Sequence, residues 1–355
     1  MIRKGILNTI VFSLKMKALW LLTFLCTSIN QLSAQDIHFS QFYNAPQTLN
    51  PALTGNIDGN MRVILNHRSQ WGSIDVPFVT SSFAFDSRLL GERWRVKGDA
   101  LGAGIAVVND KSGDGNLNNL EIRLGTAYHN MFGYEQAHSF SYGIQVGFFQ
   151  RSIDYSKLVF GSQYFGEEFV PSSPSGENIS DFSILRTDVQ AGMVYQYIKP
   201  GKFNMDAGLS FFHLTRPNGS LLNQDYRVPM RTVFHWSSRI QVKDGVLLCP
   251  GVLFVNQRNA RELEFGSNAE YLLKTEHNAN IYVDMGLWYR LSDALVVTGG
   301  AEYQKWKVML SYDINMSELR AATNRNGGFE IGVIYNNKVL PGKGKLSHVV
   351  PCLRL

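Results

Sequence analysis

The sequence has few cysteines, and none is arranged as a metal ligand. Of its three cysteines, Cys26 lies in the N-terminal segment, and Cys249 and Cys352 are far apart. Either these two pair in an oxidising compartment or both stay free; the sequence fits both interpretations. No Cys/His cluster has the spacing of a metal site. We therefore expect no metal and no cofactor.

The sequence also lacks a strong charge of one sign. It holds 34 basic and 29 acidic residues, and four of the basic residues lie within 1–34, so the remainder has 30 basic against 29 acidic residues. No basic stripe follows any part of the chain, and we expect no nucleic-acid partner.

Long apolar runs are absent as well. The longest, 18–26, follows four basic residues and precedes the small-residue exit 32–34. This order is typical of a cleaved signal peptide over 1–34, with Met16 as an alternative start. The other interpretation, a membrane anchor, requires about 20 apolar residues, more than this run supplies. No later run approaches that length, so the mature protein is either soluble or crosses a membrane by strands.

Residues that alternate between apolar and polar fill most of the chain. In 307–315, Leu310 and Tyr312 fall on one face, whereas Ser311 and Asp313 fall on the other. Period two indicates strands, and about fourteen are expected: 61–69, 78–86, 101–109, 118–129, 139–151, 187–198, 202–213, 232–243, 246–256, 262–274, 280–291, 294–304, 306–316 and 329–337. The ninth is the weakest, because Pro250 cannot donate to a ladder.

Two folds fit this pattern: a soluble β-sandwich or lipocalin-like barrel, and a barrel in lipid. The number of strands suits a closed meander without edges. Aromatic residues near many strand ends suit the interfacial girdles of membrane barrels. We therefore predict an all-β fold: a transmembrane antiparallel up-and-down β-barrel over 61–355, in contact with outer-membrane lipid.

The connections favour the same orientation as in outer-membrane barrels, which have short periplasmic turns and longer outer loops. Most even-numbered connections are short, whereas the odd-numbered connections 152–186 and 214–231 are long. Long loops on a rigid barrel commonly bind partners. Aromatic residues of 152–186 are candidate partner anchors, unless they fold the loop over the barrel mouth: Tyr155, Phe160, Tyr164, Phe165 and Phe169.

Charged side chains lie on the polar faces of the strands, which a barrel turns toward its lumen. The predicted lumen-facing residues are Glu121, Arg123, Asp206, Asp284, Glu302, Asp313 and Glu330. They form either an ion or substrate path or a filled interior in which opposite charges pair; we favour the filled interior. The non-strand lead-in 35–60 is expected on the periplasmic side and is a candidate plug. Within it, Asn50 and Pro51 form either a simple turn at the barrel mouth or part of that plug.

Several segments occur in a specific order along the chain: Gln35–Asn44, Leu49–Gly55, Asn66–Trp71, Gly300–Tyr303 and Gly327–Glu330. In this order, they resemble the PorP/SprF family of Bacteroidetes outer-membrane proteins. The resemblance implies a cell-envelope role with the type IX secretion system, partners among its components and secreted adhesin-like surface proteins, and for some members gliding motility.

Three classes of function are open to an outer-membrane barrel. A secretion-linked barrel that binds or anchors a secreted surface protein is our first hypothesis. The alternative is a passive outer-membrane channel or hydrophobic-solute transporter. A barrel enzyme is not expected, because no Ser/His or acidic dyad and no known catalytic motif can be assembled from the sequence; we predict no catalytic residues.

Overall fold

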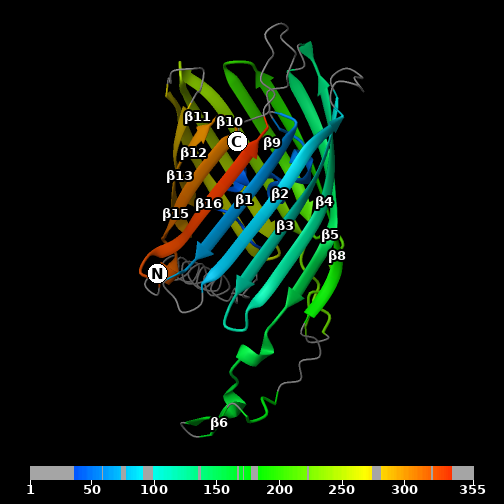
Figure 1. Cartoon of the computed structure of the whole chain (residues 1–355), viewed down its shortest axis with the longest axis vertical. Coiled ribbons are helices and arrows are strands. Elements are labelled where there is room, and N and C mark those ends of the chain that lie inside the picture. Colours follow the sequence, from blue (N-terminus) through cyan, green and yellow to red (C-terminus); the bar gives the residue numbers. More distant parts are fainter. Residues whose placement is uncertain are drawn as a thin grey trace, which may run out of the picture. The chain divides into compact units, whose positions relative to one another are not determined.

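The structure is a computed structural model of the whole chain (Figure 1). It describes residues 36–57, 59–72, 77–90, 99–134, 137–165, 168–170, 172–176, 183–221, 224–273, 281–320 and 323–337. The predicted signal peptide and Cys352 lie outside the described residues. Cys249 is a free thiol among the described ones.

Fourteen antiparallel strands close into one barrel, in which sequence neighbours pair and β16 returns to pair with β1. The strands are β1 Met61–Gln70, β2 Phe78–Leu90, β3 Ala100–Ser112, β4 Leu117–Phe132, β5 His138–Ser152, β8 Ser183–Lys199, β9 Phe203–Phe212, β10 Arg231–Lys243, β11 Val246–Gln257, β12 Ala260–Leu273, β13 Ile281–Arg290, β14 Ala294–Tyr303, β15 Trp306–Asn315 and β16 Asn326–Asn336. The prediction of an up-and-down barrel of about fourteen strands is confirmed.

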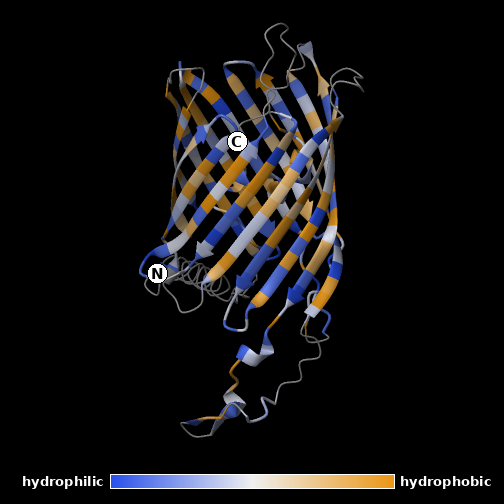
Figure 2. Cartoon of the chain, viewed as in Figure 1, coloured by the Kyte–Doolittle hydropathy of each residue, from blue (hydrophilic) through white to orange (hydrophobic). Residues whose placement is uncertain are grey.

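The two faces of each strand differ as the alternation of the sequence requires. On β15, Leu310 and Tyr312 are each 43% exposed, whereas Ser311 and Asp313 are 2% exposed. Figure 2 shows the same alternation of hydrophobic and hydrophilic residues along the strands of the barrel. Apolar side chains therefore cover the outside, and polar side chains fill the inside, as in barrels that stand in lipid. None of the helices in the described residues is long and apolar enough to cross a membrane.

Strand β11 forms despite Pro250, and the ladder shows the consequence. Its pairing with β10 runs through Ser237 and Gly251 and resumes at Ile240 and Leu248, so it is interrupted beside the proline. On the other side, Pro250 stands opposite Ser267 of β12 within a continuous ladder. The missing N–H of Pro250 thus interrupts the ladder at one place, but the strand still forms.

The two longest connections lie at the same end of the barrel, which we call the long-connection end. They are 153–182, between β5 and β8, and 213–230, between β9 and β10. The first carries the two-stranded sheet β6 (Tyr164–Phe165) and β7 (Glu168–Phe169) and extends away from the barrel in Figure 1. The turns 244–245 and 304–305 lie at the opposite end.

Residues 36–57 form no strand and lie inside the barrel; we call them the lumen segment. They contain three single-turn elements: η1 (Phe42–Asn44), α2 (Pro46–Leu49) and η2 (Pro51–Leu53). Their apolar side chains form the main hydrophobic core together with inward-facing residues of the strands: Val194, Phe212, Val233, Leu253, Trp288 and Val296. The core of this protein is therefore the content of its lumen.

Candidate functional site

The lumen segment is the feature that decides what the interior can do. Six of its residues are completely buried, namely Ser40, Gln41, Asn44, Asn50, Ala52 and Thr54. Buried polar groups need partners, and the inward face of the barrel supplies them from one end of the lumen to the other.

At the long-connection end, Asp36 holds the start of the lumen segment. Its carboxylate lies 2.7 Å from Nε2 of His213 and 3.7 Å from Nε of Arg231, and its backbone N–H donates to Gln257 over 2.9 Å. Nδ1 of His213 in turn lies 2.7 Å from the carboxylate of Asp188. His213 and Arg231 border the connection 213–230, Gln257 ends β11, and Asp188 lies within β8.

One turn deeper, the lumen segment meets a dense set of charges. The Ser40 hydroxyl donates to Asp313 over 2.7 Å, and its backbone N–H donates to Glu330 over 2.8 Å. Arg68 lies 2.8 Å from Asp313, and Arg290 lies 3.1 Å from Glu264. Opposite charges alternate in this part of the lumen and satisfy one another, which is what a filled interior requires.

In the middle of the lumen, aromatic rings replace the charges. The Tyr43 and Trp288 rings are stacked with centroids 5.3 Å apart, and Phe42 meets Trp288 edge to face at the same distance. The amide of Asn268 donates to the Tyr43 hydroxyl over 3.1 Å and accepts from the Trp288 indole over 2.6 Å. Both polar tips are thus satisfied inside an apolar cluster.

Asn50 lies at the centre of the strand-lined interior and not at the mouth. Its side-chain amide donates to the carbonyl oxygens of Met193 and Leu209 and lies 3.2 Å from Nε2 of His235. Its side-chain oxygen accepts the N–H of Ala52 over 2.9 Å and so caps the turn that begins at Pro51. Asn provides this cap, and Pro suits the first position of the turn.

Glycines on the inward faces make room for this part of the segment. A Cβ on Gly192 would lie 2.1 Å from Oδ1 of Asn50, and one on Gly143 would lie 2.3 Å from the carbonyl carbon of Pro51. A Cβ on Gly102 would lie 2.2 Å from the carbonyl oxygen of Thr54. At these strands, the segment packs directly against the barrel backbone.

The lumen segment leaves at the opposite end of the barrel. The N–H of Gly55 donates to Asp86 over 2.8 Å, and Arg88 donates to the carbonyl of Ile57 over 2.9 Å. Both partners lie in the half of β2 nearest its C-terminal end. The segment therefore runs through the whole lumen, from the long-connection end at Asp36 to the opposite end at Ile57.

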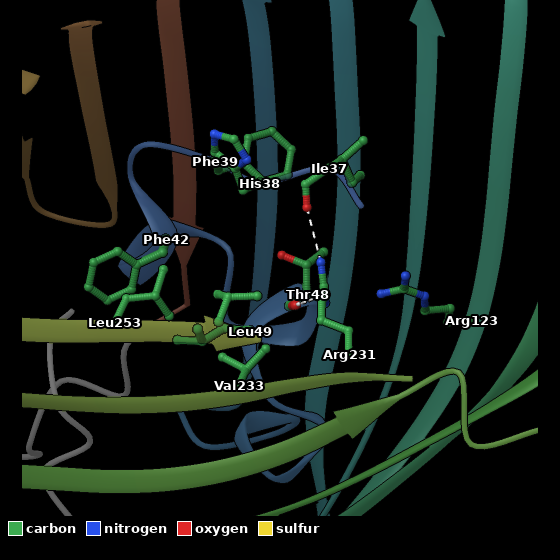
Figure 3. A pocket seen from close by; sticks show the side chains of 11 residues that line it. Ile37, His38, Phe39, Phe42, Thr48, Leu49, Arg123, Arg231, Val233 and Leu253 are labelled. Atoms are coloured by element: carbon green, nitrogen blue, oxygen red, sulfur yellow. Dashed lines mark hydrogen bonds between the residues drawn. The ribbon is translucent and has the colours of Figure 1, made fainter. Parts of the chain in front are cut away.

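Two spaces beside the lumen segment are small. Figure 3 shows one of about 40 Å³ between Phe42, Leu49 and Val233, with the guanidinium of Arg231 donating to the carbonyl of Ile37 over 3.1 Å. A second, of about 30 Å³, lies near Cys249 and Lys307. Each holds no more than a few water molecules.

The predicted lumen-facing residues belong to separate clusters. Arg123, Asp206, Asp284, Glu302, Asp313 and Glu330 are buried, and Glu121 is partly exposed. Asp284 lies 3.2 Å from Lys307, Arg123 pairs with Glu121, and Asp206 accepts from Ser237 over 2.6 Å. A filled interior with paired charges was expected, but which charges pair depends on neighbouring strands and on the path of the lumen segment, and the sequence did not predict these partners. Sequence analysis also missed Arg290 and Arg68 as centres of the charge network.

The aromatic residues of connection 153–182 form two pairs outside the barrel. The rings of Tyr155 and Phe160 lie 5.2 Å apart and are half-buried, and those of Tyr164 and Phe169 lie 5.2 Å apart and are exposed. The side chain of Phe165 lies outside the described residues.

The same connection has an acidic position close to the first ring pair. Asp154 accepts from the hydroxyl of Ser156 over 2.6 Å, and this bond lowers the pKa of the carboxyl group.

Comparison with solved structures finds other barrels at low identity. The toluene transporter TbuX of Ralstonia pickettii is 12% identical, with a TM-score of 0.48 over 82% of this chain and 92% of that chain. A FadL homologue of Pseudomonas aeruginosa is 11% identical, with a TM-score of 0.43 over 81% and 93%. Scores below 0.5 transfer no function. No curated protein matches the sequence. The model of the family described as "Type IX secretion system membrane protein PorP/SprF" matches residues 31–335.

Proposed function

Because the chain belongs to the PorP/SprF family of type IX secretion system membrane proteins, we propose that it binds or anchors a secreted, adhesin-like surface protein at the cell exterior. In this proposal, a signal peptide directs the chain to the outer membrane and is removed. The long-connection end faces outward, other components of the secretion system contact the barrel, and no catalytic step is involved.

The filled lumen is the observation that carries the proposal. A channel needs a continuous path, but here the lumen segment is hydrogen-bonded to the wall from Asp36 to Ile57. The polar interior is occupied by the protein itself, so a partner must bind at the ends of the barrel. Connection 153–182, with exposed Tyr164 and Phe169, offers the larger surface there, and aromatic residues are common interface anchors.

A gene deletion tests the secretion role. Cells lacking the protein should grow nearly normally but lose one surface protein, or its anchoring, from the exterior, and should spread less on agar if that protein serves motility. Surface proteomics of intact cells measures the loss. An unchanged surface proteome in the deletion strain would contradict the proposed role.

Substitution of the exposed ring pair, Tyr164 and Phe169, tests its contribution to binding of the surface protein separately from barrel assembly. The double substitution Tyr164→Ser/Phe169→Ser should reduce the amount of that surface protein. Tyr134→Ser is the matched control, because Tyr134 is an exposed aromatic in the connection at the opposite end of the barrel. Equal effects of both variants would remove connection 153–182 from the proposed binding surface.

Conductance distinguishes the alternative of a passive channel or hydrophobic-solute transporter. The purified barrel in planar bilayers should show little steady current, because its own chain occupies the lumen. Large and stable porin-like currents would favour the channel.

A further inference from the structure

The barrel wall has a step between β8 and β9 at the long-connection end. Strand β8 pairs with β5 from Ser183 opposite Ser152 to Tyr197 opposite His138. Its pairing with β9 begins only at Ala191, opposite Phe211. Residues 183–190 of β8 therefore extend beyond the regular ladder with β9, and one edge of this extension faces away from the barrel sheet.

The direction of the backbone groups on this edge follows from one bond. Leu214, just past β9, donates its N–H to the carbonyl of Val189 over 3.0 Å. Since backbone groups alternate in direction along a strand, the N–H groups of Leu185 and Thr187 point to the same side, away from β5. Neither N–H has a hydrogen-bond partner among the residues that the structure describes.

The chain already uses the inner part of the edge. After Leu214, the hydroxyl of Thr215 donates to the carbonyl of Thr187 over 3.4 Å and to Asp188 over 2.8 Å, and the chain then turns away at Arg216, which has a φ of 44°. A short strand-like segment thus occupies the edge next to the barrel and leaves its outer part open.

We propose that the open edge of β8 at residues 183–187 receives an extended segment of the secreted surface protein, added as a further strand. The proposal rests on the proposed function and names where and how the partner binds. Backbone N–H groups cannot face lipid without partners, so the edge stands clear of the hydrocarbon layer. An unpaired edge strand is a template for strand addition.

The side chains of the edge fit such a partner. Leu185 is 57% exposed on the outward face, and Ile184, on the inward face, is buried. An added strand would place alternate apolar side chains beside Leu185, while its backbone pairs with Leu185 and Thr187. The extension continues the sheet of β5 and β8, so the added strand would occupy the position that β9 occupies deeper in the wall.

Leu185→Pro removes one outward N–H and leaves the β5 ladder intact, because Leu185 does not donate to β5. Edge positions tolerate proline. One lost bond of about 1 kcal/mol corresponds to roughly a fivefold loss of affinity. We expect about a fivefold loss of the surface protein that the deletion strain lacks. Leu185→Ala, which keeps the N–H, is the matched control and should change that amount much less.

Gel mobility of boiled and unboiled samples checks that each variant assembles. A photo-crosslinking amino acid at position 185 gives a second measurement in the assembled barrel. It should crosslink the same surface protein, whereas one at Val146, exposed on neighbouring β5, should not.

The results separate the two proposals. Full retention of the surface protein by Leu185→Pro, or equal crosslinking from both positions, would overturn strand addition and leave the proposed function standing. If proline prevents assembly, the crosslinking result alone decides. A deletion that loses no surface protein would overturn both.

Discussion

The two halves of the lumen wall hold the same segment by different means. The wall formed by β3, β4, β5, β8 and β9 faces residues 47–55 with glycine. At Gly102 and Gly143 the contact is backbone against backbone, and at Gly192 and Gly208 the side chain of Asn50 lies against the wall. The wall formed by β12, β13, β15, β16 and β1 faces residues 38–41 with charged side chains. The first wall holds the lumen segment by close fit, since its glycines leave no room for a Cβ, and the second wall holds it by paired charges.

This difference has a consequence for how each wall fails. A side chain added to the glycine wall meets backbone that cannot move aside without displacing a strand. A charge removed from the other wall leaves its former partners buried and unpaired. The first change should prevent the barrel from closing around the lumen segment, whereas the second should weaken a barrel that still forms.

The largest effect is expected at the glycine wall. Gly143→Val places side-chain atoms where the backbone of Pro51 lies, with the Cβ alone 2.3 Å from its carbonyl carbon. Overpacking costs about 1–3 kcal/mol where neighbours can adjust, and more where backbone blocks the site. We expect almost no folded, heat-modifiable barrel in outer-membrane fractions.

Gly299→Val provides the control, because a Cβ on Gly299 would meet nothing nearer than 3.9 Å. It should assemble as the unmodified chain does. Normal assembly of Gly143→Val would mean that the lumen segment does not pack against β5.

At the charged wall, Arg290→Met should leave an assembled but less stable barrel. Arg290 lies 3.1 Å from Glu264 and 3.3 Å from both Glu262 and Asp313. Breaking a buried ion pair on one side costs about 3–5 kcal/mol. Urea unfolding in detergent, followed by gel mobility, measures the lost stability.

Arg227→Met is the comparison, since Arg227 and Asp225 form an exposed pair and exposed pairs contribute little. Similar midpoints for the two variants would mean that Arg290 is not a centre of the charge network.

Most of the fold was predictable from sequence because the two faces of a membrane-barrel strand differ in polarity. The alternation of apolar and polar residues is therefore visible in the sequence. Every strand must present apolar residues outward at alternate positions, so Leu310 and Tyr312 of β15 identify the orientation of Ser311 and Asp313 without reference to other strands. Pro250 weakened the prediction for β11 only because propensity is a local property, whereas the ladders with β10 and β12 stabilise the strand from both sides.

The lumen segment was not predictable in the same way. Residues 36–57 have no period, and their partners lie far away in sequence: Ser40 and Asp313 are separated by 273 positions. The inward position of Glu330 follows from alternation, but its bond to the backbone of Ser40 depends on the path of a segment without regular structure. The indirect signal was the excess of glycine on inward faces, which indicates that something approaches the wall closely.

A smaller effect is expected at Asn50, which binds the backbone of the glycine wall and His235 of the neighbouring strand β10. Asn50→Ala removes the bonds to Met193, Leu209 and Ala52. Unsatisfied buried partners cost about 1–3 kcal/mol. The variant should assemble and unfold at lower urea concentration than the unmodified protein, but at higher concentration than Arg290→Met.

Gln241→Ala is its control, because Gln241 is exposed and its side-chain bond to Asp244 is 3.5 Å long. If Asn50→Ala unfolded at the same urea concentration as this control, the bonds of Asn50 would not contribute to the stability of the barrel.

The smallest effect is expected at Asp36, where the lumen segment begins at the long-connection end. Asp36→Asn removes the negative charge beside His213 and Arg231, where the side chain is 21% exposed and water compensates part of the loss. We expect a local cost of about 1 kcal/mol, or roughly fivefold faster local opening. Global unfolding should not change, since the core around Phe42 and Trp288 is untouched. Hydrogen exchange resolves the difference: the amides of Ile37 to Ser40 should exchange faster, whereas those of Ala52 to Ile57 keep their rates. Faster exchange along the whole segment would show that the two walls hold one cooperative unit, and the distinction between a shape-selective and a charge-selective wall would then be lost.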